Sequence, residues 1–187
     1  MKMENSTTPI KIGITGGIGS GKSYVCRLLE RRGIEVYDCD AAAKRLIRTS
    51  TRLRRQLQKL IGSLEKADIS RFLLASEENQ QAVNAIVHPA VFQDFEESGK
   101  QWMESAILYE SGANKLVDRV VAVTAPEEVR IRRVMNRDSI SREQALQWIA
   151  RQWPQDQVRG RADFEIVNDG ESDLEQQIEK LLNQLTT

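Results

Sequence analysis

Short apolar runs alternate with longer amphipathic stretches along most of the chain, and this alternation predicts strands separated by helices. Strands are predicted at residues 10–15, 34–37, 102–108, 119–124 and 164–167. The valine-rich run at 119–124 is typical of a strand buried on both faces of a parallel sheet. The pattern therefore predicts an α/β fold, a three-layer α/β/α sandwich around a five-stranded parallel sheet.

Helix signals fill the intervals between these runs. A helix is predicted to begin near Lys22, and another to begin at Ser76, with Pro89 interrupting and kinking it. Capping boxes are predicted at Thr124, Ser141 and Ser172, each of which precedes a glutamate or glutamine by three residues. Each box marks the expected first turn of a helix.

The chain is expected to form one domain over residues 1–187, because this length supports one sizeable core. The core is assigned to 10–40, 100–125 and 162–187. No strand signal appears in 41–98, so several helices are expected there as a substrate-binding insertion. A helical pair at about 126–161 is a candidate lid.

The composition limits which binding partners and which cellular compartment are expected. Acidic and basic residues balance at 27 each, so no net field favours nucleic acid or a membrane surface. Cys26 and Cys39 have no metal-ligand spacing, and one histidine cannot build a histidine-based metal site. No signal peptide is visible, and no apolar window is long enough to span a membrane, so a soluble cytoplasmic protein is expected. The sequence does not indicate the oligomeric state.

The most specific feature is the stretch Gly16-Gly17-Ile18-Gly19-Ser20-Gly21-Lys22-Ser23, between the first strand and its helix. It has the P-loop spacing Gly-x4-Gly-Lys-Ser. Glycines let the backbone curl so that its N–H groups face a phosphate at a helix N-terminus. Lys22 supplies charge for the terminal phosphates, and Ser23 supplies a hydroxyl for Mg²⁺. The alternative is a glycine-rich turn with a chance Lys-Ser.

Two carboxylates, Asp38 and Asp40, follow the second strand at the sheet edge where ligands bind in α/β folds. This strand tip is expected beside the P-loop. Their functional interpretation is a general base with a metal or substrate ligand. The alternative is a solvated loop or a helix N-cap, and Asp40 is the candidate cap.

Arg130, Arg133 and Arg137 are expected on one face of a helix, at steps of three and four residues. Their mutual repulsion makes sense if a polyphosphate neutralises them, because each guanidinium can grip two phosphoryl oxygens. A solvated basic face is the alternative. His88, taken alone, is expected to be a packed or hydrogen-bonded side chain.

The motifs together resemble the dephospho-coenzyme A kinase family over about residues 10–175. They are Thr15–Ser23, Asp38–Asp40, Val87-His88-Pro89, Leu108–Glu110, Arg133–Asp138, Gln152, Ala162–Phe164 and Asn168–Gly170. The resemblance implies phosphorylation of the 3′-hydroxyl of dephospho-CoA, with ATP and Mg²⁺, as the last step of coenzyme A synthesis.

The resemblance also implies roles for particular residues. The catalytic set would be Asp38, Lys22 and Arg137, with Ser23 on the metal. ATP would contact Gly17, Ile18, Gly19, Ser20, Gly21, Lys22, Ser23, Tyr24, Arg133 and Arg137. Dephospho-CoA would contact Asp38, Asp40, Lys66, His88 and Glu110. Lys66 stands where the family usually has arginine, which weakens the case for a bidentate phosphate grip there.

Two other functions remain open on the sequence alone. Another P-loop kinase, similar to shikimate or gluconate kinase, would also pair a P-loop with Asp-x-Asp, but the long insertion with His88-Pro89 disfavours it. A nucleotide-dependent switch would bind a protein partner without metabolic turnover. The chain lacks Asp-x-x-Gly and a guanine-reading motif, which disfavours a GTPase switch.

Overall fold

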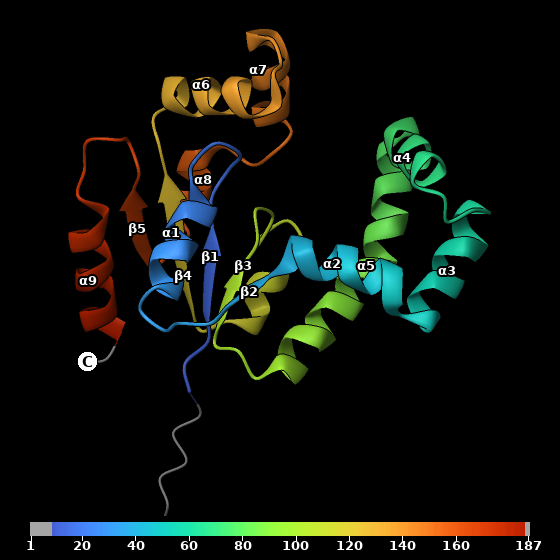
Figure 1. Cartoon of the computed structure of the whole chain (residues 1–187), viewed down its shortest axis with the longest axis horizontal. Coiled ribbons are helices and arrows are strands. Elements are labelled where there is room, and N and C mark those ends of the chain that lie inside the picture. Colours follow the sequence, from blue (N-terminus) through green and yellow to red (C-terminus); the bar gives the residue numbers. More distant parts are fainter. Residues whose placement is uncertain (1–8, 186–187) are drawn as a thin grey trace, which may run out of the picture. The chain divides into compact units, whose positions relative to one another are not determined.

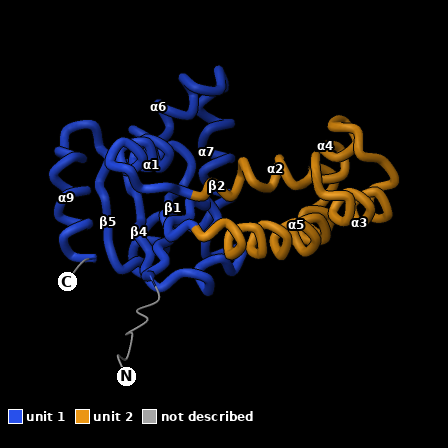
Figure 2. The backbone as a smooth tube through the Cα atoms, turned by 60° about the horizontal axis from the view of Figure 1, so that its bottom comes forward, with its two compact units in different colours: residues 1–36, 100–187 blue, residues 37–99 orange. Residues whose placement is uncertain are grey.

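The computed structural model describes residues 9–185. These residues divide into two compact units, the first made of residues up to 36 together with 100–185, and the second of 37–99 (Figure 2). Within the described residues, no helix is both long and apolar enough to cross a membrane.

The sheet consists of β1 (Ile12–Thr15), β2 (Val36–Asp38), β3 (Trp102–Glu104), β4 (Arg119–Thr124) and β5 (Phe164–Val167) (Figure 1). The strand order is β2-β3-β1-β4-β5. The pairs β1–β3, β1–β4 and β4–β5 are parallel, with Ile12 opposite both Trp102 and Arg119. The predicted α/β class and its five-stranded parallel sheet are therefore confirmed.

Two expectations about the strands are wrong. The third strand ends at Glu104 and does not continue to Leu108, because the chain turns at 105–112. In addition, β3 lies between β1 and β2, so the strand that ends in Asp38 is not the neighbour of the strand that precedes the P-loop. Apolar runs alone do not specify the order in which strands pair.

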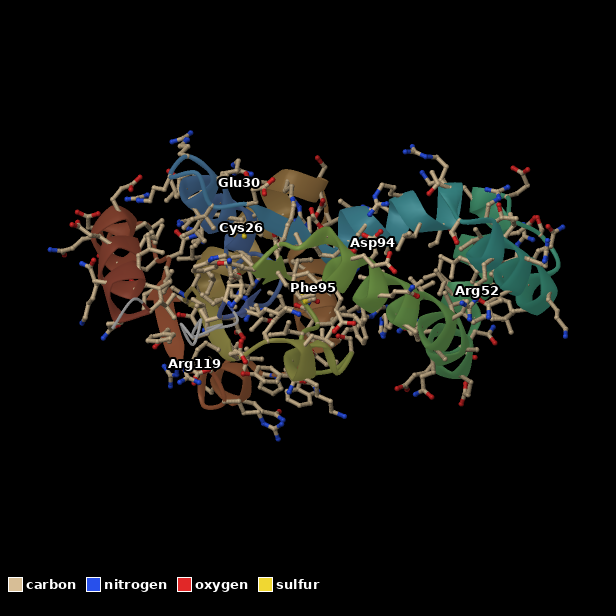
Figure 3. All side chains as sticks on the ribbon, turned by 90° about the horizontal axis from the view of Figure 1, so that it is seen from below. Cys26, Glu30, Arg52, Asp94, Phe95 and Arg119 are labelled. Atoms are coloured by element: carbon tan, nitrogen blue, oxygen red, sulfur yellow. The ribbon has the colours of Figure 1, made fainter. Side chains whose placement is uncertain are left out.

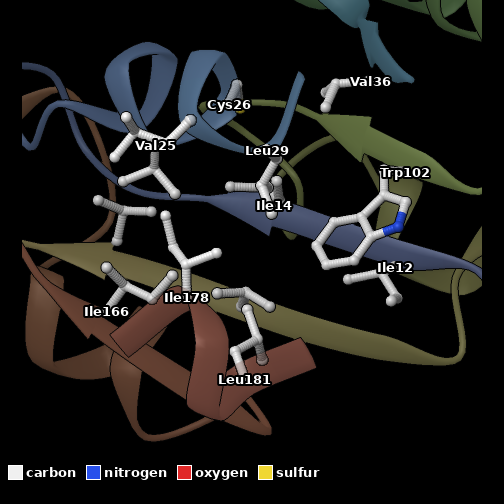
Figure 4. Close-up of a cluster of buried hydrophobic side chains, with 13 residues drawn as sticks. Ile12, Ile14, Val25, Cys26, Leu29, Val36, Trp102, Ile166, Ile178 and Leu181 are labelled. Atoms are coloured by element: carbon white, nitrogen blue, oxygen red, sulfur yellow. The ribbon is translucent and has the colours of Figure 1, made fainter. Parts of the chain in front are cut away.

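The core of the first unit combines α1 (Lys22–Glu30) and α9 (Leu174–Leu185) with inward-facing strand residues. Ile14, Val25, Leu29 and Ile178 are completely buried in this cluster (Figure 4). The short helix α8 (Gln155–Arg159) packs against β4 and lies behind the sheet in Figure 1. Helices thus flank the sheet as a three-layer fold requires.

The remaining helices of this unit are the 3₁₀ turn η1 (Ala113–Leu116), α6 (Glu127–Asp138) and α7 (Arg142–Ala150). The capping box predicted at Ser141 is confirmed, since its side chain and that of Gln144 bond each other's backbone. The other two boxes are wrong. Thr124 donates its hydroxyl to Glu165 at 2.7 Å, and Asp173, not Ser172, accepts the N–H of Gln176.

The second unit contains α2 (Cys39–Thr49), α3 (Thr51–Ile61), α4 (Lys66–Ala75) and α5 (Glu77–Ser98). The side chains of α5 that are buried repeat every four residues, at Val83, Val87, Val91 and Phe95. One stripe of a helix therefore forms the core of this unit, together with buried residues of α2 and α3. The helix continues through Pro89, so the predicted interruption is wrong.

A polar network holds the beginning of this unit against its last helix. The Tyr37 hydroxyl donates to Asp94 Oδ2 at 2.7 Å, and Arg45 also bonds this carboxylate. The rings of Tyr37 and Phe95 pack edge to face, with their centroids 5.3 Å apart. Figure 3 shows Asp94 and Phe95 on α5. Burial raises the pKa of Tyr37, and the bond to Asp94 adds to the increase.

The chain leaves and rejoins the first unit at neighbouring residues. Lys100 Nζ donates to the carbonyl oxygen of Val36 at 3.1 Å. The 63 residues of the second unit, numbered 37–99, are thus inserted between two positions that are bonded to each other.

Candidate functional site

The P-loop joins β1 to α1 and presents unpaired amides. Among residues 9–185, no protein acceptor binds the main-chain N–H of Gly19, Gly21, Lys22 or Ser23. Gly21 is the N-cap of α1 with φ of 86°, and a Cβ there would lie 2.0 Å from Nδ2 of Asn168. Glycine is therefore required, and the free N–H groups at the positive end of the helix form an anion site.

The carbonyl groups of the same loop are occupied by donors from other elements. Arg130 Nε donates to Ile18 O at 3.0 Å, and Arg133 Nη1 lies 3.3 Å from the carbonyl oxygens of both Gly19 and Ser20. Asn168 Nδ2 donates to Ser20 O at 2.9 Å. These bonds hold the loop by its carbonyls and leave its amides for a ligand.

Arg133 was expected on ATP, and in this structure its guanidinium bonds the P-loop backbone and Asn168. Arg130 is only 4% exposed and Arg133 is half-buried, so neither of these arginines forms a solvated basic face. Arg137 differs, because it is exposed at the end of α6 and pairs with Asp138, with Nη2 2.6 Å from Oδ2.

The first turn of α1 meets a carboxylate that sequence reasoning missed. Lys22 Nζ lies 2.9 Å from Glu104 Oε1, and Ser23 Oγ donates to the same oxygen at 3.0 Å. The side chains of Lys22 and Glu104 are each 12% exposed. Burial alone would raise the pKa of Glu104. The Lys22 charge and hydrogen bonds from Lys22, Ser23 and Cys26 outweigh it, so the pKa lies below its usual range.

Glu104 stands at the carboxyl end of β3, directly beside β1 in the sheet. The signal available in the sequence was an acidic residue inside an otherwise apolar run. A strand that continued to Leu108 would place Glu104 in its interior, away from the sheet edge at which the site is expected, whereas β3 ends at Glu104.

Asp38 and Asp40 belong to the second unit, and the structure assigns their local roles differently from the sequence. Asp38 is the N-cap of α2, and its Oδ1 accepts the N–H of Ala41 at 2.9 Å. The candidate cap Asp40 instead lies inside the first turn, so that assignment is wrong. The helix begins at Cys39, directly after β2, and this early start explains the change.

The other predicted substrate-side residues are spread over both units. Lys66 is exposed at the start of α4. His88 is half-buried on α5, where its ring stacks on that of Phe92 with the ring centroids 5.9 Å apart. Burial lowers the pKa of His88. Glu110 is exposed in the first unit, and its Oε1 accepts the N–H of Trp153 at 3.3 Å. Tyr24 is 44% exposed on α1, beneath the guanidinium of Arg27.

Comparison with known proteins shows which family this chain belongs to. The model of the dephospho-CoA kinase family matches residues 10–174, which include the P-loop, Glu104 and the whole second unit. The chain belongs to the dephospho-CoA kinase family. The resemblance found from the sequence motifs is confirmed, and so is the expectation that the protein is a kinase.

A named member of the family and a solved structure each match nearly the whole chain. A dephospho-CoA kinase of Bacteroides fragilis is 42% identical over 92% of this chain and 91% of its own length. The crystal structure of TT1252 from Thermus thermophilus has a TM-score of 0.85 at 33% identity, covering 96% of this chain and 98% of the other. The second unit is therefore contained in the matched length.

Shikimate kinase, which represents the alternative function considered from the sequence, shares only the fold with this chain. Shikimate kinase from Acinetobacter baumannii has a TM-score of 0.61 at 18% identity, over 96% of this chain and 94% of its own. A likeness at this level reports the P-loop kinase architecture and carries no information about the acceptor.

Proposed function

We propose that this member of the dephospho-CoA kinase family transfers the terminal phosphoryl group of ATP to the 3′-hydroxyl of dephospho-CoA, which gives coenzyme A. The observation that carries the proposal is the P-loop whose lysine and serine converge on Glu104. Family membership supports the choice of acceptor. A cytoplasmic location stays a prediction, supported by two buried cysteine thiols.

ATP would bind with its phosphates on the free amides of the loop. Those of Gly19, Gly21, Lys22 and Ser23 have no protein acceptor among the described residues. Lys22 has three N–H donors and gives one to Glu104, so the others are available for phosphate oxygens. Phosphoryl transfer depends mostly on such positioning and charge stabilisation.

The residues around Ser23 fit a magnesium ion. Mg²⁺ prefers hard oxygen ligands and is held by one or two protein groups together with substrate phosphates. Ser23 and Glu104 supply a hydroxyl and an ionised carboxylate 3.0 Å apart, and the described residues contain no cluster of three or more acidic, histidine or cysteine ligands. When bound, the ion would neutralise charge on the β- and γ-phosphates.

Asp38 is proposed to orient or deprotonate the 3′-hydroxyl. One of its oxygens caps α2, while the other accepts no hydrogen bond from the described part of the chain, and the side chain is exposed. A carboxylate with a fixed backbone and an available oxygen suits a general base. Its place at a strand end and the family motif support this role.

The remaining assignments stay proposals of the same kind. Arg137 would leave Asp138 and contact ATP from the end of α6, since an exposed ion pair is weakly held. Arg133 would contribute by fixing the loop carbonyls as well as through charge. Exposed side chains offered to dephospho-CoA are those of Asp40, Lys66 and Glu110, and the stacked ring of His88 would help shape the second unit.

An acceptor panel tests the proposal. ADP release would be followed in a coupled assay with dephospho-CoA, shikimate, gluconate or nucleoside monophosphates, at fixed ATP and Mg²⁺. Rapid turnover is expected with dephospho-CoA alone, and the product should carry its new phosphate on the 3′ oxygen by ³¹P NMR. Turnover only with shikimate would replace the proposed activity. Tight nucleotide binding with no acceptor-stimulated release would favour the switch.

A further inference from the structure

Both peptide groups of Ile18 are held by side chains from the segment 126–161. The N–H of Ile18 donates to Gln152 Oε1 at 2.6 Å, and its carbonyl accepts from Arg130 Nε at 3.0 Å. We call these two bonds the Ile18 clamp. Ile18 lies at the centre of the P-loop, directly before the loop residues whose amides are free.

Arg130 forms the carbonyl half of the clamp from a buried position. Its side chain is almost fully buried, yet it forms no salt bridge within the described residues. A guanidinium buried without a carboxylate is costly, so such a residue is retained where its hydrogen bonds matter. Arg130 also passes so close to the loop that a Cβ at Gly17 would fall 2.4 Å from its Nη2.

The Gln152 half is anchored from the other side. Gln152 lies between α7 and α8, and the next residue, Trp153, donates its backbone N–H to Glu110. The Trp153 ring stacks on Tyr109, with centroids 5.9 Å apart and planes inclined by 2°. The junction between α7 and α8 is therefore fixed to the segment after β3 and to the P-loop at once.

We propose that Gln152 and Arg130 are positioning residues for nucleotide binding. They hold the two peptide groups that flank Ile18 in one orientation, which keeps the following N–H groups aligned on the phosphates. Because both come from the predicted lid segment, the clamp also couples that segment to the loop. The inference rests on the proposed function only in taking the nucleotide to be ATP.

The test compares Gln152→Leu and Arg130→Met with matched controls. Gln155→Leu is the control for the first, because Gln155 Oε1 accepts the N–H of Ala125, outside the P-loop. Arg132→Met is the control for the second, because Arg132 is exposed on the same helix. The affinities for ADP and ATP would be titrated without acceptor, and amide hydrogen exchange would be followed at Ile18.

Loss of one neutral hydrogen bond predicts about fivefold weaker nucleotide binding for Gln152→Leu, and loss of a charged donor predicts about tenfold or more for Arg130→Met. The KM for dephospho-CoA should not change. The double variant should resemble Arg130→Met alone, because the two bonds fix the two peptide groups that flank one residue, Ile18. Exchange at Ile18 should rise in Gln152→Leu, and Gln152→Glu, which keeps an acceptor oxygen, should restore protection.

The proposal is overturned if Gln152→Leu matches Gln155→Leu in nucleotide affinity and in Ile18 exchange, within twofold. It is also overturned if the two single effects add fully in the double variant. Should Arg130→Met fail to fold, Gln152→Leu still decides, because it removes one acceptor from a partly exposed side chain. Failure of dephospho-CoA as acceptor, with clamp-dependent ADP binding intact, would count against the proposed function alone and support the clamp.

Discussion

The P-loop of the first unit and the helices of the second unit are held in place in contrasting ways. In the first, the P-loop is held by individual polar bonds from Arg130, Arg133 and Asn168 to backbone carbonyls. In the second, an apolar stripe on α5 forms the core, and one network around Asp94 secures the beginning of the unit. Substitutions of the P-loop lysine and serine should therefore change chemistry more than stability, and core substitutions in the second unit should do the reverse.

The sharpest test of this contrast is Lys22→Ala. Removing the ammonium should reduce turnover to background, because loss of even one preorganised donor costs about 10²–10³-fold and here a full charge is lost. The melting temperature should fall only through loss of the ion pair with Glu104, which keeps its hydrogen bonds from Ser23 and Cys26. Steady-state kinetics with dephospho-CoA and a thermal melt provide the two measurements. Wild-type turnover in this variant would refute the kinase site.

Asp38→Asn comes next and concerns the beginning of the second unit. Asparagine caps a helix as well as aspartate does, so α2 should keep its N-cap while the base is lost. Turnover should fall by about 10²–10⁴-fold. The kcat of the pure variant provides the measurement, and Asp38→Ala is the comparison that also removes the cap. A loss below threefold would reduce Asp38 to a structural residue.

Phe95→Ala tests the second unit directly. The side chain is fully buried beside Tyr37, and truncation should destabilise the protein by about 3–5 kcal/mol. Urea denaturation gives the change in the free energy of unfolding. Leu74→Ala is the control, because Leu74 is 77% exposed and should matter by less than about 0.5 kcal/mol. Equal effects of the two variants would contradict the assigned core.

The smallest expected effect is a change in pH dependence from Glu104→Gln. The folded-state pKa of Glu104 is depressed, so its contribution to stability is complete above the unfolded pKa of about 4.3 and is lost as pH falls through the folded value. The variant should therefore lose less stability than wild type on acidification below this point. Thermal melts from pH 7 to pH 3 measure it, with Glu179→Gln, an exposed substitution on α9, as control. Parallel curves for all three proteins would contradict the assigned ion pair.

The sequence predicted those parts of the fold that depend on local pattern. The P-loop, the strands at 119–124 and 164–167 and the cap at Ser141 are defined by residues close together in the chain. What it missed depends on contacts between distant segments. Glu104 meets Lys22 across 82 positions, and Gln152 meets Ile18 across 134.

Errors in detail have local physical causes. The proline at 89 removes one donor from α5, but the buried stripe on either side of it keeps the helix continuous. Both Asp38 and Asp40 are suitable N-cap residues for α2. Asp38 is the cap because β2 ends there and the helix begins at the next residue. The strand order could not be predicted from the sequence, because an apolar run is compatible with several neighbouring strands. In the structure, β3 occupies the position next to β1 that was expected for β2.

The bond between Lys100 and Val36 has a consequence for redesign. An insertion whose two ends are close together can be replaced by another, provided that the replacement restores the last two residues of β2, Tyr37 and Asp38. Residues 37–99 lie between such a pair of positions, Val36 and Lys100. A replacement insert would also have to supply the carboxylate proposed as the base, because Asp38 lies within residues 37–99, while the P-loop and Glu104 lie outside them.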